Sequence, residues 1–289
     1  MAIEYDRMMA MNNLGQSFSY GDRDVMLYAY AIGMGSDPLD QAELAFVNEA
    51  WAIPRPLKVV PTFASIAAWD AEPQEVTRSL ANPVLVLDAE RDITFHKQLA
   101  PAAEITADCS VNAVYDKGKD KGAIICFRTL LKDNEGQLIA TLLTSWFARG
   151  DGGFGGPYAE RRGPHRVPTR APDRIIDITT RPDQALLYRL CGDRFPLHSD
   201  PEYAKSAGFP RPILHGMCTY GITCRGVLET YADYDPGAFR QHAARFSSPV
   251  FPGETLTLEL WKEGSVISFE AKVKARGVTV VKNGMTVLN

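Results

Sequence analysis

Apolar and polar positions along the chain repeat one arrangement twice, with helical spacing first and strand-like patterns after it. In the first half, apolar residues at helical spacing predict a helix over 22–34 and a short one over 62–69. Strands are then predicted over 84–87, 93–96, 104–115, 123–131 and 137–149. The polar, glycine-containing stretch 132–136 is typical of a turn, so we expect an antiparallel meander.

The second half begins with a predicted strand over 174–180 and helical turns over 183–190 and 201–207. The longest predicted helix covers 215–231, where apolar residues repeat three, four and seven positions apart. Strands follow over 239–246, 255–261, 266–274 and 277–287. A helix packed on an antiparallel sheet is an α+β unit, and two such units would account for the length of the chain.

Glycine, proline and arginine are concentrated between residues 150 and 172. No helix or central strand tolerates so many residues that break regular structure. We therefore expect an N-terminal domain over 1–150, a linker over 151–172 and a C-terminal domain over 173–289.

Composition narrows the class of protein. The chain has 289 residues, of which 45% are hydrophobic and 23% are charged, as in ordinary globular proteins. A formal charge of -4 argues against coating nucleic acid or an anionic membrane. No apolar run reaches the length of a membrane span, and no secretory or C-terminal targeting signal is evident. The five cysteines form no CxxC pair, which favours a reducing compartment, and we expect the cytoplasm.

The densest polar cluster covers residues 188–201 and contains Asp193 and His198. These two residues are five positions apart across a proline, so both side chains could face one cavity. A carboxylate and an imidazole that share one water can exchange protons with it as acid and base. Alternatively, Asp193 caps a turn and His198 is a structural histidine, and the spacing alone favours this second interpretation.

A second candidate, the segment Pro212-Ile213-Leu214-His215-Gly216, opens the longest predicted helix. A glycine at a helix N-terminus lets a backbone N–H approach a ligand oxygen, where the helix dipole favours negative charge. The enolate of a thioester would need such a donor. Equally, Gly216 could serve only close packing of the helix on its sheet, and for His215 we expect a capping or structural role.

These segments together resemble the signature of the MaoC-like (R)-specific 2-enoyl-CoA hydratases, also called hydratase 2. That signature reads Tyr-Arg-Leu-Ser-Gly-Asp-x-Asn-Pro-Leu-His, then Asp-Pro, Ala-Gly-Phe and Pro-Ile-Leu-His-Gly. Its residues recur here between Tyr188 and Gly216, and Val60–Phe63, Tyr115–Lys119 and Gly152–Gly156 resemble motifs of the family's N-terminal half. The resemblance implies a double hot-dog fold whose degenerate N-terminal half shapes the acyl pocket and whose second half keeps the catalytic pair.

The resemblance also assigns roles to individual residues. It gives the water-holding pair to Asp193 and His198, and binding of the thioester carbonyl to the backbone N–H of Gly216. The substrate and CoA contacts that it implies are His96, Lys97, Lys117, Arg194, Phe195, Pro196, Leu197 and Phe246. The residues themselves add that Lys117, Lys119 and Lys121 form a basic loop able to meet CoA phosphates, although a solvated turn explains Lys119 and Lys121 better. By default, Phe246 packs in the core of the sheet.

The implied activity is reversible hydration of a trans-2-enoyl-CoA to a (3R)-3-hydroxyacyl-CoA. The resemblance also implies an acyl-CoA as the binding partner, a homodimer as the assembly, and a reaction that requires neither metal nor redox cofactor. Phe195 departs from the family, which usually has asparagine there. Three alternatives remain: a hot-dog thioesterase, an acyl-CoA-binding protein without catalysis, which Phe195 favours, and a metallohydrolase built on Asp193, His198 and His215. The last is the weakest, because HExxH-type spacing is missing.

Overall fold

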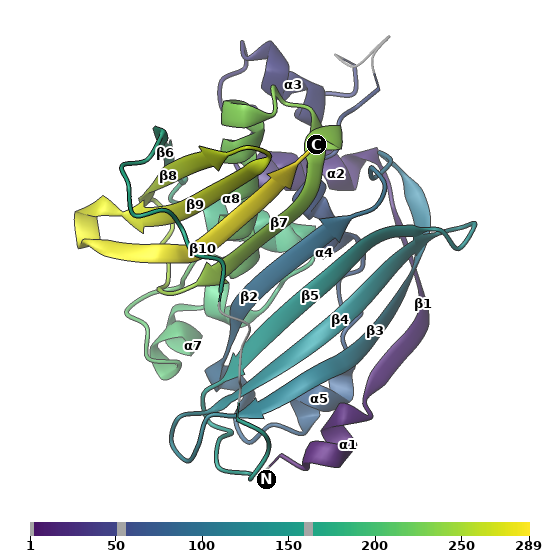
Figure 1. Cartoon of the computed structure of the whole chain (residues 1–289), viewed down its shortest axis with the longest axis vertical. Helices are drawn as coiled ribbons and strands as arrows, with labels where there is room; N and C mark the ends of the chain where they lie inside the picture. The colour runs from purple at the N-terminus through teal and green to yellow at the C-terminus, as the bar shows by residue number, and fades with distance from the viewer. Residues whose placement is uncertain (1–2, 51–55, 159–163) are drawn as a thin grey trace.

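The computed structural model describes residues 3–50, 56–158 and 164–289 of the chain (Figure 1). The strands are β1 (Asn12–Tyr20), β2 (Val86–Phe95), β3 (Ala103–Asp116), β4 (Ala123–Asp133), β5 (Leu138–Ala148), β6 (Arg174–Thr179), β7 (Phe239–Phe246), β8 (Thr255–Glu263), β9 (Val266–Val273) and β10 (Val278–Leu288). The α-helices are α1 (Tyr5–Met9), α2 (Asp22–Ala31), α3 (Gln41–Val47), α4 (Ala64–Ala67), α5 (Gln74–Arg78), α6 (Gln184–Tyr188), α7 (Pro201–Ser206) and α8 (Gly216–Tyr231). Short 3-10 turns are η1 (Pro61–Phe63), η2 (Pro83–Leu85), η3 (Arg189–Cys191), η4 (Pro196–His198), η5 (Pro236–Ala238) and η6 (Lys274–Arg276). In these three ranges, no helix is both long and apolar enough to cross a bilayer.

The strands of the described residues form one 10-stranded sheet in the order β1-β3-β4-β5-β2-β7-β10-β9-β8-β6. Each half of the chain contributes its strands in the same spatial order: first, third, fourth, fifth, second. Every neighbouring pair is antiparallel. The α+β class expected from the sequence is therefore confirmed, and the two halves are topological repeats joined into a single sheet.

The two halves meet where β2 pairs with β7, near the centre of the sheet in Figure 1. In this pair Glu90 lies opposite Arg245, and Thr94 lies opposite Gln241. The Gln241 amide also donates to both carboxylate oxygens of Asp92, at 2.8 and 3.0 Å. The junction thus combines backbone pairing with polar side-chain contacts across the two halves.

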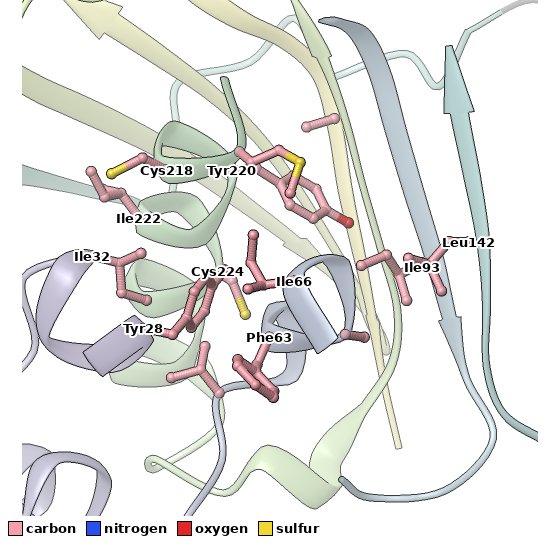
Figure 2. Packing of buried hydrophobic residues seen from close by; sticks show 14 of the residues in the cluster. Tyr28, Ile32, Phe63, Ile66, Ile93, Leu142, Cys218, Tyr220, Ile222 and Cys224 are labelled. Carbon is pink, nitrogen blue, oxygen red and sulfur yellow. The ribbon is translucent and has the colours of Figure 1, made fainter. Parts of the chain in front are cut away.

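Helix α8 is the longest helix of the described residues and is buried on nearly all sides over its first three turns. Figure 2 shows Tyr28 of α2 and Ile32, which follows the last residue of α2, packed beside it. Gly221 makes this approach possible, because a Cβ there would lie 2.7 Å from both Ile32 Cγ2 and Tyr28 Oη. The first half also brings η1 and the short α4 to this core (Figure 2), but its longest described helix, α2, has 10 residues against 16 in α8.

One prediction of strand boundaries was wrong. The predicted strands 84–87 and 93–96 are the two ends of one strand, β2 (Val86–Phe95), whereas Val84 and Leu85 lie in η2. The charged residues between the two ends interrupt the apolar pattern but not the backbone pairing. The sequence pattern also missed β1, whose side chains are mostly exposed, and the short helices α1, α3 and α5. Residues 150–158 and 164–172, the described parts of the glycine- and proline-rich segment, contain neither helix nor strand.

We expect Gly221→Val to lower the free energy of unfolding by about 1–3 kcal/mol, because the added methyl groups overpack the contact between α8 and α2. Equilibrium unfolding in urea measures the change. Glu229→Ala on the same helix is exposed and serves as the control, with an expected change within about 0.5 kcal/mol. Equal stability of the two variants would contradict the packing described here.

Candidate active site

The segment between α6 and α7 turns sharply at Gly192 and then presents Asp193. Gly192 has a φ of 140°, a backbone conformation that favours glycine, and a Cβ there would lie 3.0 Å from Trp69 Cγ. After the turn, the Asp193 carboxylate accepts the backbone N–H of Phe195 at 3.1 Å. Asp193 is therefore fixed by the turn itself, and any residue at position 195 except proline could supply this N–H.

His198 ends the turn η4, and its tautomer follows from its hydrogen bond. Its Nδ1 lies 2.9 Å from the backbone oxygen of Ile213. A carbonyl oxygen only accepts, so Nδ1 carries the proton and Nε2 keeps an unprotonated lone pair. His198 can therefore act as a proton acceptor through Nε2.

His215 lies directly behind this pair and is completely buried. Its ring stacks on that of His198 with centroids 3.8 Å apart, and its Nε2 donates to the backbone oxygen of Asp193 at 3.1 Å. One acceptor atom from each of Asp193, His198 and His215 lies within 4.8 Å of the others. The in-plane lone pairs of two stacked rings do not converge on one ion, so this cluster suits a bound water better than a metal.

Burial changes the protonation of the pair. It raises the pKa of Asp193 to about 6, and the nearby Asp88 carboxylate adds to the increase. Burial lowers the pKa of His198 to about 4 and holds the pKa of His215 well below its usual value. Near neutral pH the carboxylate of Asp193 is thus mostly ionised and His198 is neutral, so both can accept a proton from one water.

Gly216 is the first residue of α8, and its surroundings are crowded. A Cβ there would lie 3.4 Å from both Asp88 Cβ and Phe246 Cε2. The first N–H groups of a helix have no partner within the helix, and the helix dipole adds partial positive charge at this end. The backbone N–H of Gly216 can therefore stabilise an oxygen that becomes negative.

A cavity of about 870 Å³ lies between the two halves and contains these groups. The second half lines it with Asp193, His198 and Gly216, whereas the first half contributes residues from 69–77, 86–91 and 146–149. Its volume lies in the range of small-molecule and cofactor sites. Four predicted contacts also line it: Lys117, Phe195, Leu197 and Phe246.

Four other predicted contacts do not line the cavity: His96, Lys97, Arg194 and Pro196. His96 lies eight positions after Asp88, and at about 3.3 Å per residue β2 carries it up to about 26 Å from Asp88 along the strand direction. There His96 Nε2 lies 3.0 Å from Thr141 Oγ1, and Lys97 forms a 2.8 Å ion pair with Asp133. The structure therefore does not support His96 and Lys97 as contacts of this cavity.

The loop that carries Lys117 is anchored to the segment after β5. The Asp116 carboxylate accepts backbone N–H groups of Gly118, Gly153 and Gly155 at 2.7–2.8 Å. Burial alone would raise the pKa of Asp116, but these three N–H donors stabilise the carboxylate and hold its pKa below the usual value. A Cβ at Gly152 would lie 2.2 Å from the Gly118 oxygen, so the glycines allow the close contact that places Lys117 beside the cavity.

Comparison with known protein families finds a match for each half of the chain. Residues 165–284 match the model of the MaoC like domain, and residues 18–150 match that of the MFE-2 hydratase 2 N-terminal domain. The enoyl-CoA hydratase ChsH3 of Mycobacterium tuberculosis is 39% identical over 99% of this chain and 98% of its own length. The chain belongs to the MaoC-like hydratase 2 family.

Solved structures support the same fold. The crystal structure of a MaoC-like dehydratase from Phytophthora capsici is 33% identical, covers 98% of both chains and has a TM-score of 0.85. A Mycobacterium tuberculosis protein described as a double hot-dog fold is 13% identical, covers 96% of both chains and has a TM-score of 0.55. The double hot-dog architecture is therefore confirmed.

Apart from Lys117, sequence reasoning missed the side chains that the first half contributes to this hydratase-family site. Asp88 and Arg91 of β2, together with Arg149 after β5, line the cavity, and Arg149 contacts the second half through the backbone oxygen of Ala207 at 3.4 Å. One signal was present in the sequence: the charged run 88–92 lies in a strand that is central in the sheet, where charges need partners.

The geometry of His198 can be tested without any substrate. We expect its imidazole to stay in the neutral Nδ1–H form from neutral pH to about pH 5, because burial lowers its pKa to about 4. Nitrogen-15 chemical shifts of labelled histidine would report both tautomer and titration, with His198→Ala assigning the signal. A His198 signal that titrates between pH 6 and 7 would contradict the buried geometry.

Proposed function

We propose that this protein catalyses reversible addition of water to a trans-2-enoyl-CoA, giving a (3R)-3-hydroxyacyl-CoA, in β-oxidation-type metabolism of fatty acids or steroid side chains. The proposal rests on one observation: Asp193, His198 and the first residue of α8, Gly216, all line the same cavity. Homology to enoyl-CoA hydratase ChsH3 over nearly the full length of both chains supports the same reaction class.

The proposed chemistry follows from the acceptors that the site presents. Conjugation with the thioester makes C3 of the substrate electrophilic. Water donates its two O–H groups to His198 Nε2 and the Asp193 carboxylate, and its oxygen adds to C3 as one proton passes to the pair. Negative charge then moves to the thioester oxygen, where the Gly216 N–H and the α8 dipole stabilise it. The pair returns the proton to C2, so one water is added in total and no further cofactor takes part.

The CoA part of the substrate would meet the basic residues along the cavity. Lys117 and Arg149 come from the first half, and Arg245 and Lys282 come from the second. Such side chains bind phosphates through charge-assisted hydrogen bonds. We propose that other first-half residues of the cavity wall, including Trp69, contact the acyl group.

Phe195 does not by itself indicate a binding protein without catalysis. Its backbone N–H orients Asp193, and its ring packs edge-on against Tyr203 with centroids 5.3 Å apart. The side chain therefore forms part of the cavity wall, and we propose that it affects which acyl groups fit rather than whether water is added. The homodimer and the cytoplasmic location stay predictions.

Purified protein should hydrate 2-enoyl-CoA substrates, measured as loss of enoyl-thioester absorbance with crotonyl-CoA and with a bulky 2-enoyl-CoA. We expect Asp193→Asn and His198→Ala each to lower kcat by about 100-fold or more, because each removes an acceptor for the attacking water. Chiral analysis should give the 3R alcohol.

The matched control for this experiment is Asp200→Asn. Asp200 caps α7 and is exposed, and asparagine caps a helix equally well, so activity should persist. Binding of enoyl-CoA without hydration would favour the binding-protein alternative. Release of free thiol, measured in the same assay, would favour a thioesterase.

The pH dependence of hydration follows from the shifted pKa values. As pH falls, Asp193 gains a proton near its pKa of about 6 and stops accepting from water, and His198 follows near its pKa of about 4. We therefore expect kcat/KM to be constant above about pH 7 and to decrease below about pH 6. Initial rates between pH 5 and 9 measure this profile. A profile that instead rises as pH falls through 6 would require a protonated Asp193 and contradict the proposed role.

A further inference from the structure

An ion pair lies in the wall of the cavity beside Gly216. Arg91 Nη2 and Asp88 Oδ1 are 2.8 Å apart, and the Arg91 side chain is only 7% exposed. Both residues line the cavity. An enoyl thioester is uncharged where it reacts, so a buried ion pair at this position is not explained by ground-state binding of the acyl group.

The local geometry of β2 creates this pair. The register of β2 with β5 shifts between Asp88 and Glu90, which makes Ala89 the extra residue of a bulge. Residues three apart in a regular strand point to opposite faces, but the bulge turns Asp88 and Arg91 to the same face. Arg91 is held further by Thr144 of β5, whose Oγ1 accepts from Nη1 at 2.8 Å.

The second carboxylate oxygen of Asp88 points toward the helix end. Asp88 Oδ2 lies 3.5 Å from the position that a Cβ on Gly216 would occupy. A lone carboxylate here would repel the enolate that forms beside the Gly216 N–H. Arg91 compensates this charge.

We propose that Arg91 is a positioning residue for hydration, which holds and neutralises Asp88 so that negative charge can develop on the thioester oxygen at Gly216. The inference rests on the proposed function. Within the described residues, Arg91 Nε has no hydrogen-bond partner, so the guanidinium donates hydrogen bonds to Asp88 and Thr144, while its charge also acts on the Glu72 and Asp193 carboxylates. Asp88 is the carboxylate that Arg91 holds by a hydrogen bond, and it lies beside Gly216, so Arg91 acts on the reacting oxygen through Asp88.

The test is a double-mutant cycle on hydration of crotonyl-CoA. Arg91→Gln should lower kcat by about 30-fold or more with little change in KM, because it leaves a buried carboxylate uncompensated beside the developing charge. Adding Asp88→Asn to Arg91→Gln should restore kcat by about tenfold, since the repelling charge is then gone. Arg91→Lys, which keeps the cation, should lie between wild type and Arg91→Gln.

The matched control is the exposed pair Arg170 and Asp173, which has the same i,i+3 spacing and a 2.6 Å contact. Arg170→Gln, alone and with Asp173→Asn, should leave kcat unchanged. If the double variant at positions 88 and 91 is no faster than Arg91→Gln, the inference is overturned and Arg91 is only structural. Thermal unfolding of each variant shows whether a loss of rate reflects a loss of fold.

A second measurement does not depend on turnover. Acetoacetyl-CoA forms an enolate that absorbs in the near ultraviolet, so its absorbance when bound reports the electrostatics at the thioester oxygen. Wild type should enrich the enolate, Arg91→Gln should lose this enrichment, and the double variant should regain it. If wild type hydrates no 2-enoyl-CoA, the proposed function fails, while this absorbance still decides the inference about Arg91 and Asp88.

Discussion

The antiparallel pairing of β2 with β7 is the contact on which the rest of this structure depends. Each half-sheet alone would end in an unpaired strand edge, and the pairing satisfies both edges at once. It also fixes the first half relative to α8, so that Asp88 lies beside the N-terminal end of that helix and residues 86–91 line the same cavity. The cavity between the halves is a consequence of this junction.

The junction explains why charged residues occupy a central strand. Asp92 accepts from Gln241 across the pairing, and Glu90 lies 3.5 Å from Arg245. Asp88 and Arg91 pair with each other where β2 bulges. Buried charges are tolerated where partners are supplied, and here strands of both halves supply them.

Burial of the catalytic pair has a chemical consequence. The same desolvation raises the pKa of Asp193 and lowers the pKa of His198. The carboxyl group therefore has a higher pKa than the imidazole, which is the reverse of free side chains. His215 contributes by stacking on His198 and holding the Asp193 backbone. Because the two groups share one water, they are best regarded as a coupled pair rather than as separate acid and base.

The sequence by itself determined the features that depend on neighbours along the chain. It predicted most strands of the sheet, the long helix α8, and the turn that carries Asp193 and His198, because local periodicity and turn chemistry specify these elements. The short contiguous stretch 188–216 also contained the whole catalytic cluster. Only the tertiary structure decided what faces that cluster. Strand register and the bulge in β2 bring Asp88 and Arg91 to it and keep His96 and Lys97 away, since pairing between distant strands leaves no local pattern.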